Sequence, residues 1–368
     1  MDYNSGRMGI SEGIALAFIV TFPPVFLSFP SAAAASVGSA GWVIGVPAAL
    51  VIGVVMFMLA YVFARHPGDL IAVTEKLLGR LVANVVGIFY CGLLLSFAIL
   101  WTREFAENTL LTALPYADFP FVVACYVISA GFILLAGIEN ICRATYIILP
   151  FIITGILLAL AGLFSFYRPY NLLPWQGKGL FSFGEPTLSL IGLSGGLSVL
   201  TMLAPAFQSV KTIKGAVIFG YGGSVVLRIL SGAVFTMVFG ANVAMEKTLP
   251  FYEMTRLIYI DRYLQRFEAL FILLWVMVGV LAIAVSLYGA IFITAKLFRL
   301  PTIKPLIPCI TLIIAQMAML PPDAKSVSVI EAILYPYVFA PGIIIIPVAL
   351  LIATIIKGGK KSCPHTQG

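Results

Sequence analysis

Ten apolar stretches, each long enough to cross a lipid bilayer, occupy almost the whole of this chain of 368 residues. A transmembrane helix needs about 20 consecutive apolar residues, and each stretch meets or approaches that length. Hydrophobic residues make up 61% of the chain and charged residues only 10%, which excludes a water-soluble globular protein. The stretches are residues 9–37, 41–64, 81–102, 120–138, 144–167, 187–207, 213–240, 265–297, 303–320 and 328–356.

The ten stretches are predicted to be helices. Backbone groups in hydrocarbon must be hydrogen-bonded within one helix or within a closed barrel, and the alternating pattern of barrel strands is absent from this sequence. We therefore expect an all-α integral membrane protein with ten transmembrane helices, folded as a single transmembrane domain over residues 1–368. Residues 357–368 are expected to form a polar tail.

The distribution of Lys and Arg between the connections predicts the orientation in the membrane. With ten spans both termini lie on one side, and that side carries most of the basic residues, so both termini are predicted to be cytoplasmic. The formal charge of +7 then reflects topology and contact with anionic lipid. Because no basic patch is interleaved with exposed aromatic residues, we expect no nucleic-acid partner.

Two stretches are interrupted near their middles. The first contains Pro23 and Pro24, which lack backbone donors and clash with the preceding turn, and then Pro30. The sixth contains three glycines within residues 192–196, which lower helix propensity. Each interrupted stretch opens a group of five spans. This pattern predicts a five-plus-five inverted repeat, about 9–167 and about 187–356, with broken helices 1 and 6 meeting at the midplane.

Broken helices that meet in a membrane form a site for a small polar molecule. The freed N–H groups favour an anionic group and the freed carbonyls favour a cation or ammonium, so a zwitterionic amino acid would suit both. Candidate binding residues from the two breaks are Thr21, Phe22, Val25, Leu27, Ser28, Ser194, Gly195, Gly196, Ser198 and Thr201. Residues that could complete the wall, or equally serve helix packing, are Tyr90, Gly92, Ser96, Ser286, Tyr288 and Gly289.

Arg228 is the charge placed most centrally in the membrane by these spans. A central charge costs at least about 2.5–3.5 kcal/mol, so Arg228 is expected to face protein or water. Contact with an anion, coupling of a conformational change and a buried structural tie all remain open.

The fifth stretch, 144–167, contains no Lys, Asp or Glu, and we infer no proton coupling through a membrane carboxylate.

Metal binding and enzymatic chemistry are not indicated. The two histidines, His66 and His365, lie outside the predicted spans, and the five cysteines are scattered with no CxxC pair. We predict no metal, no cofactor and no enzymatic activity.

Two connections carry amphipathic patterns. Residues 241–264 have apolar residues at helical spacing, which predicts one or two helices lying on the outer face of the membrane. Residues 67–80 show a similar pattern and are expected to lie along the cytoplasmic surface.

Three segments resemble the spore germination B-subunit permeases, within the amino acid–polyamine–organocation superfamily of carriers. They are LSFP at 27–30, GLSVLTMLAP at 196–205 and LPFYEMTRLIYIDRYLQRFEALFILLW at 249–275. The resemblance implies a five-plus-five inverted-repeat fold in the spore inner membrane or cell membrane. It also implies a small-molecule germinant, such as an amino acid or a sugar, and A-type and C-type receptor subunits as partners.

Two positions depart from the pattern of these carriers. The first break usually contains glycines whose N–H groups meet a substrate carboxylate, whereas Pro23 and Pro24 offer no donor. Ser198 stands where an acidic residue is frequent in the family.

Three functions stay open: a germinant-sensing receptor subunit, a secondary transporter of amino acids or related metabolites, and an assembly subunit that binds no ligand.

Overall fold

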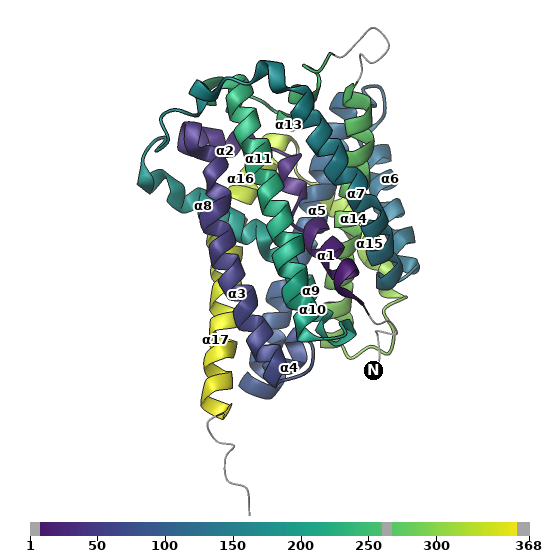
Figure 1. The fold of residues 1–368 in the computed structure, drawn as a ribbon. Coiled ribbons are helices and arrows are strands. Elements are labelled where there is room, and N and C mark those ends of the chain that lie inside the picture. Colours follow the sequence, from purple (N-terminus) through teal and green to yellow (C-terminus); the bar gives the residue numbers. More distant parts are fainter. Residues whose placement is uncertain (1–7, 260–266, 359–368) are drawn as a thin grey trace, which may run out of the picture.

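The protein is a bundle whose long helices run roughly along one common axis (Figure 1). The computed structural model describes residues 8–259 and 267–358. In this part of the chain the only departure from helices, turns and loops is one isolated bridge between Met8 and Phe207. Within residues 8–259 and 267–358, six helical segments are long and apolar enough to cross a membrane. The prediction of an all-α membrane protein is confirmed, and the count of ten spans stays a prediction.

The first half of the chain contains three long helices and a broken one. The largest difference from the sequence prediction is α5, which runs to Thr112 rather than ending at 102. Its charged residues do not end the helix, because Arg103 is buried and pairs with Glu107 one turn further on. The elements are α1 Ile10–Ile19, η1 Pro23–Val25, α2 Phe29–Val37, η2 Gly38–Ile44, α3 Gly45–Arg65, α4 Leu70–Leu78, α5 Arg80–Thr112, α6 Phe119–Leu135 and α7 Ile138–Gly162.

The second half also opens on an interrupted helix. The elements are η3 Phe164–Phe166, η4 Pro169–Leu172, η5 Leu180–Phe183, α8 Gly184–Leu193, η6 Ser194–Leu197, α9 Ser198–Met202, η7 Ala204–Ala206, α10 Val210–Gly215, η8 Ala216–Tyr221, α11 Gly222–Phe239, α12 Ala241–Ala244, α13 Pro250–Thr255, α14 Phe267–Leu297, α15 Leu306–Ala318, α16 Ala324–Ile333, η9 Leu334–Phe339 and α17 Ala340–Gly358. Of these, η8 and η9 are π-helical turns.

Two connecting segments form short helices, as their amphipathic patterns predict. The amphipathic stretch 67–80 forms α4, whose N-terminus is capped by the carboxylate of Asp69. The stretch 241–264 forms α12 and α13, and residues 260–266 lie outside the described part of the chain.

The α14 helix is the central element of the bundle. It is the most deeply buried of the six candidate spans and packs against α5, α6 and α7. The α1 helix packs against α7 and η8. Both helices therefore lie inside the bundle, which places the first interruption among neighbouring helices rather than in lipid.

The two predicted interruptions have different structures. Between α1 and α2 the chain leaves the α-helix at Val20 and passes through the short turn η1, because Pro23 and Pro24 cannot donate to the preceding turn. Between α8 and α9 the chain only tightens into the 3₁₀ turn η6. The first helix is broken as predicted, whereas the interruption of the sixth is milder.

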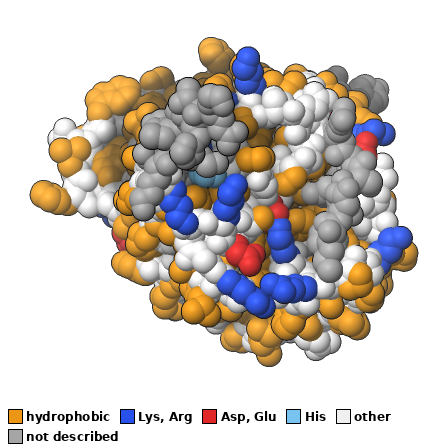
Figure 2. Space-filling model, turned by 90° about the horizontal axis from the view of Figure 1, so that it is seen from below, with side chains coloured by type: hydrophobic (Ala, Val, Ile, Leu, Met, Phe, Trp, Pro, Cys, Tyr) orange, Lys and Arg blue, Asp and Glu red, His pale blue; other side chains and the backbone are white. Residues whose placement is uncertain are grey.

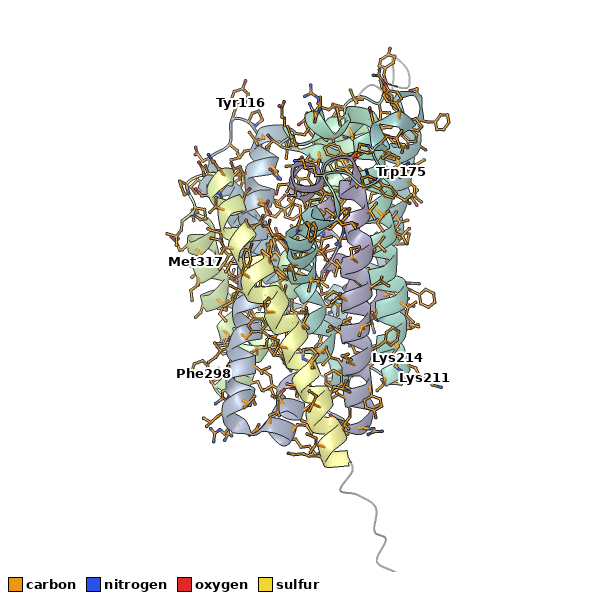
Figure 3. The ribbon with its side chains drawn as sticks, turned by 90° about the vertical axis from the view of Figure 1, so that its left-hand side faces the viewer. Tyr116, Trp175, Lys211, Lys214, Phe298 and Met317 are labelled. Carbon is orange, nitrogen blue, oxygen red and sulfur yellow. The ribbon has the colours of Figure 1, made fainter. Side chains whose placement is uncertain are left out.

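The lower end of the bundle carries a cluster of basic side chains (Figure 2). Lys211 and Lys214 lie toward this end, whereas Tyr116 and Trp175 lie toward the opposite end (Figure 3). At the lower end Lys296 of α14 also forms an ion pair with Asp69, which fixes α4 to the bundle. This distribution agrees with the basic side predicted from the sequence, and which side faces the cytoplasm stays a prediction.

Candidate functional site

A cavity of about 320 Å³ lies beside the break in the first helix, and we call it the α2 cavity. Its size is at the lower end of the range for small-molecule sites, about 300–1,000 Å³. Its walls come from the break, α2, α5, α8, α16 and η9. The lining residues are Pro24, Leu27, Ser28, Phe29, Ser31, Ala32, Ala33, Ser36, Trp101, Glu104, Glu185, Pro186, Ser189, Leu193, Ser328, Glu331, Ala332 and Tyr335.

The sequence of α2 leaves room for this cavity. After Phe29 and Pro30 the helix reads SAAAAS, so its side chains are small where they face α8 and α16. Small side chains at a helix surface leave a void unless a neighbouring helix moves in to fill it. Here the space beside α2 is not filled by a neighbouring helix and stays open.

Two carboxyl groups meet inside the α2 cavity. The hydroxyl of Ser28 donates to Oε1 of Glu104 at 3.3 Å, and the hydroxyl of Tyr335 donates to Oε1 of Glu331 at 2.9 Å. Both glutamates line the same cavity, and their carboxyl groups are close enough for their charges to interact. Two like charges this close repel each other, and a cation bound between them relieves the repulsion. The pair is thus suited to hold a cation.

The neighbouring arginine does not neutralise this pair. Arg103 lies 3.1 Å from Glu107, donates to the carbonyl of Pro322 at 3.2 Å and stacks over the ring of Phe119. Its guanidinium is thus engaged on another side of α5. Among the described residues that line the cavity, none is Lys or Arg.

Aromatic side chains hold the inner wall of the cavity in a fixed arrangement. Trp101 stacks on Phe97 with ring centroids 4.9 Å apart, and Tyr335 meets the same Phe97 ring at 5.8 Å. Trp101 is fully buried, and its indole N–H has no hydrogen-bond partner in the described part of the chain. This packing fixes the Tyr335 hydroxyl that orients Glu331.

Four of the five predicted residues of the sixth span, all except Gly196, line a different and much smaller space, which we call the α9 void. Its volume is about 20 Å³, room for roughly one water molecule. The hydroxyls of Ser194 and Thr201 donate to the nearby backbone carbonyls of Leu190 and Ser198, whereas the hydroxyl of Ser198 has no partner among the described residues. Predicted binding or wall residues around this void are Tyr90, Ser194, Gly195, Ser198 and Thr201.

The glycines of the sixth span permit close contact between helices. A Cβ added at Gly192 would lie 2.2 Å from the carbonyl oxygen of Tyr335, and one added at Gly196 would lie 2.7 Å from that of Val20. The backbone of α8 and η6 therefore touches the backbone of η9 and of the first break. The glycine signal in the sequence reflects this contact.

At the first break, only Leu27 and Ser28 of the predicted residues line the α2 cavity. The hydroxyl of Thr21 donates to Ala17 O at 2.8 Å and lies 2.9 Å from Ser224 Oγ. Phe22 stacks on neighbouring phenylalanines, and Val25 is buried beside Arg228.

Arg228 connects α11 to the break in the first helix. Its guanidinium donates to the carbonyl of Thr21 and lies 3.4 Å from Ser224 Oγ. Thr21 is the second residue after α1, and in a continuous helix its carbonyl would accept from the N–H of Val25. Here Val25 N–H donates to the carbonyl of Phe22 instead, which leaves the Thr21 carbonyl to Arg228. Of the roles left open by the sequence, the contacts favour the structural tie.

The other predicted wall residues lie away from the α2 cavity. Ser96 donates to the carbonyl of Gly92 on a partly exposed face of α5. Ser286, Tyr288 and Gly289 are buried within α14, where Gly289 is packed against Leu94. Their arrangement is that of helix packing.

Sequence analysis missed Glu104, Glu331 and their aromatic neighbours. Glu104 lies outside the third predicted stretch, which ends at residue 102. Glu331 lay inside the tenth, and a carboxylate in an apolar stretch was the signal that could have found it. Both groups lie on helices of the bundle, and the inference of no proton coupling through a membrane carboxylate stays a prediction.

Comparison with known proteins assigns the family. A model of the spore permease family, described as spore germination protein, matches residues 9–327. The chain belongs to this family. Spore germination protein A2 of Bacillus subtilis (strain 168) is 23% identical over 291 residues, which cover 76% of each chain.

Two solved structures show the same fold as this spore permease family member. MhsT in complex with L-phenylalanine has a TM-score of 0.64 at 16% identity and covers 93% of this chain and 97% of its own. A Na⁺-coupled sialic acid symporter in a substrate-bound outward-open state has a TM-score of 0.64 at 13% identity, with coverage of 98% and 92%. The chain thus shares the fold of these two proteins.

Proposed function

We propose that this chain is the small-molecule-sensing membrane subunit of a spore nutrient germinant receptor. A germinant binds in the α2 cavity, and the A-type and C-type receptor subunits respond to the resulting change of conformation. The observation that carries the proposal is a cavity of ligand size built against the broken first helix of a spore permease family member. The proposal includes no metal, no cofactor and no enzymatic reaction.

The proposal places the chain in the spore inner membrane with both termini cytoplasmic. The cluster of Lys and Arg at the lower end of the bundle supports this orientation (Figure 2). We also infer ten spans in two inverted repeats, about 9–167 and about 187–356. Their support is the interrupted helix that opens each half and the likeness of nearly the whole chain to transporters.

The α2 helix is the element that a ligand would bias. It forms one wall of the cavity and is separated from α1 by the proline break. Its other contacts include three hydrogen bonds: Ser31 Oγ to Lys247 O at 2.6 Å, Lys178 Nζ to Ala35 O at 2.5 Å and Lys178 N to Val37 O at 2.9 Å. A ligand that contacts α2 and α16 together favours the conformation in which these two helices are close.

A secondary transporter of amino acids or related metabolites is the second candidate function. The likeness of the fold to two transporters favours it. Reconstituted vesicles that accumulate a labelled nutrient, with saturation at the same concentration that stabilises the protein, would show transport. Stabilisation by the nutrient without accumulation is the result expected of a sensor.

Thermal stabilisation of the purified full-length chain tests the proposal. A panel of amino acids, sugars, nucleosides and amines is screened for a rise in the melting temperature, since a ligand at 100 times its Kd stabilises the folded state by about 2.7 kcal/mol. The control is Ala332→Trp, which fills the α2 cavity from an exposed position of its wall. We expect at least one nutrient to stabilise the natural chain and not the filled variant.

The same filled variant decides between a sensor and an assembly subunit. If spores that carry only Ala332→Trp assemble the receptor and respond to nutrients as before, the α2 cavity is not a germinant site. The chain is then better described as an assembly subunit.

A further inference from the structure

We propose that the α2 cavity selects a ligand that carries a protonated amine and no carboxylate, with its ammonium group bound between Glu104 and Glu331. This inference rests on the proposed function and names the chemical class of its ligand. It differs from the zwitterionic amino acid that the two helix breaks suggest.

The charges around the cavity favour a cation. Glu104 and Glu331 meet inside it, and Glu185 stands exposed at its edge on the first turn of α8. The described lining residues include no Lys or Arg that could balance these groups. A bound carboxylate would lose its hydration and lie beside like charges, both of which are unfavourable.

The nearby backbone does not supply a site for an anion either. Pro23 and Pro24 have no N–H groups at the first break, and Pro186 removes another donor from the first turn of α8. A ligand carboxylate in this cavity would therefore lack both a cationic side chain and the amide donors of these turns.

An ammonium group fits the carboxyl pair. It offers three donors, and a charge-assisted hydrogen bond to a carboxylate is roughly twice as strong as a neutral one. Oε1 of each glutamate already accepts from a hydroxyl, Ser28 for Glu104 and Tyr335 for Glu331. These two bonds hold the carboxyl groups in place, and the other oxygen of each remains for the ligand. The positive charge of the ammonium offsets the repulsion between the two carboxylates.

The rest of the wall suits the body of a small amine. Leu27, Phe29 and Leu193 offer an apolar surface, and Trp101 and Tyr335 add aromatic rings of the kind that attract cations. Trp101 also holds a fully buried indole N–H with no partner among the described residues.

Four-carbon probes with cationic, anionic or neutral end groups test this selectivity on the natural chain. The full-length protein in lipid nanodiscs is titrated with n-butylamine, 1,4-diaminobutane, butyrate and 1-butanol, and its melting temperature is recorded. L-alanine is included as a zwitterion. We expect saturable stabilisation by the two amines only. Stabilisation by butyrate, L-alanine or 1-butanol equal to that by the amines would overturn the amine class.

Charge-neutral variants test the two glutamates. Glu104→Gln and Glu331→Gln keep the size of the side chain, and we expect each to weaken amine binding at least about tenfold, because one charge-assisted bond is lost. The matched control is Glu75→Gln on the exposed surface of α4, which removes the same charge far from the cavity. Unchanged amine affinity in both cavity variants would overturn the assignment of the ammonium site. If one variant fails to fold, the other and the probe series on the natural chain still decide.

The outcomes separate this inference from the proposed function. If a neutral or zwitterionic nutrient stabilises the natural chain but not Ala332→Trp, the cavity is a ligand site and only the amine class is wrong. If no nutrient or amine stabilises the natural chain and spores with Ala332→Trp germinate normally, both proposals fail.

Discussion

The α2 cavity and the α9 void arise at the two interruptions that the sequence marks, yet only one has room for a ligand. The first is about 320 Å³ and the second about 20 Å³. Prolines separate α1 from α2 completely, so α2 can turn away from its neighbours. Glycines between α8 and α9 let other backbones come within contact, and the space closes. A helix-breaking sequence thus opens a cavity only where the packing does not fill it again.

Filling the α2 cavity should have the largest effect of any single change. Ala32→Trp places an indole in the cavity from an exposed position of α2, and we expect the nutrient concentration needed for germination to rise about 100-fold or more because the ligand space is occupied. The rate of germination is measured across a nutrient series. Ala35→Trp is the control, since Ala35 is exposed on the same helix and does not line the cavity. An equal loss of nutrient sensitivity in both variants would show that a bulky side chain anywhere on α2 disturbs the response, and that the cavity is not responsible.

Adding a methyl group at Gly192 should strongly destabilise the fold. In Gly192→Ala the new Cβ would lie 2.2 Å from the carbonyl of Tyr335, so η9 must shift, at a cost of about 3 kcal/mol. The melting temperature of the purified chain measures this loss. Gly53→Ala is the matched helical control with nothing within 4 Å, and it should gain up to about 1 kcal/mol. Equal stability of the two variants would contradict the close contact of α8 and η9.

Removing the guanidinium of Arg228 should destabilise the first break. Arg228→Met leaves the buried carbonyl of Thr21 without its donor, which costs about 2 kcal/mol. Arg228→Lys keeps a donor and should recover part of the loss. Melting curves of the two variants and the natural chain provide the test. A normal melting temperature for Arg228→Met, with an altered nutrient response, would instead assign Arg228 to the coupling role.

The smallest change is expected at the α9 void. Ser198→Ala removes a buried hydroxyl that has no partner among the described residues, so stability should stay the same or rise by up to about 1 kcal/mol. The nutrient response should also stay as it is, because the void holds no more than a water molecule. A lost response in Ser198→Ala, with normal assembly and stability, would return the ligand site to the meeting point of the two breaks.

Much of the architecture could be predicted from the chain because it depends on local properties. Apolar length identified the helices, and Pro23 and Pro24 located the first break. The end of α5 was misplaced because Arg103 and Glu104 look like surface residues until the partners of Arg103 and the cavity around Glu104 are known. The glycines of the sixth span were interpreted as an opening, whereas their contacts are with Tyr335 and Val20.

The candidate site was only half predictable for the same reason. Leu27 and Ser28 lie next to the break and could be named from it, whereas Glu104 and Glu331 are 227 positions apart and meet only because α5 and α16 lie side by side.

The amino-acid sequence by itself determined that this protein is a membrane-embedded bundle of helices, that its first helix is broken and that it belongs among spore germination proteins. These features follow from hydrophobicity, from the missing N–H groups of proline and from motifs local to the chain. The tertiary structure alone decided which interruption holds a cavity and which charges face it. Whether a void stays open, and which carboxyl groups come together in it, depends on how distant helices pack, and no segment of the chain contains that information by itself.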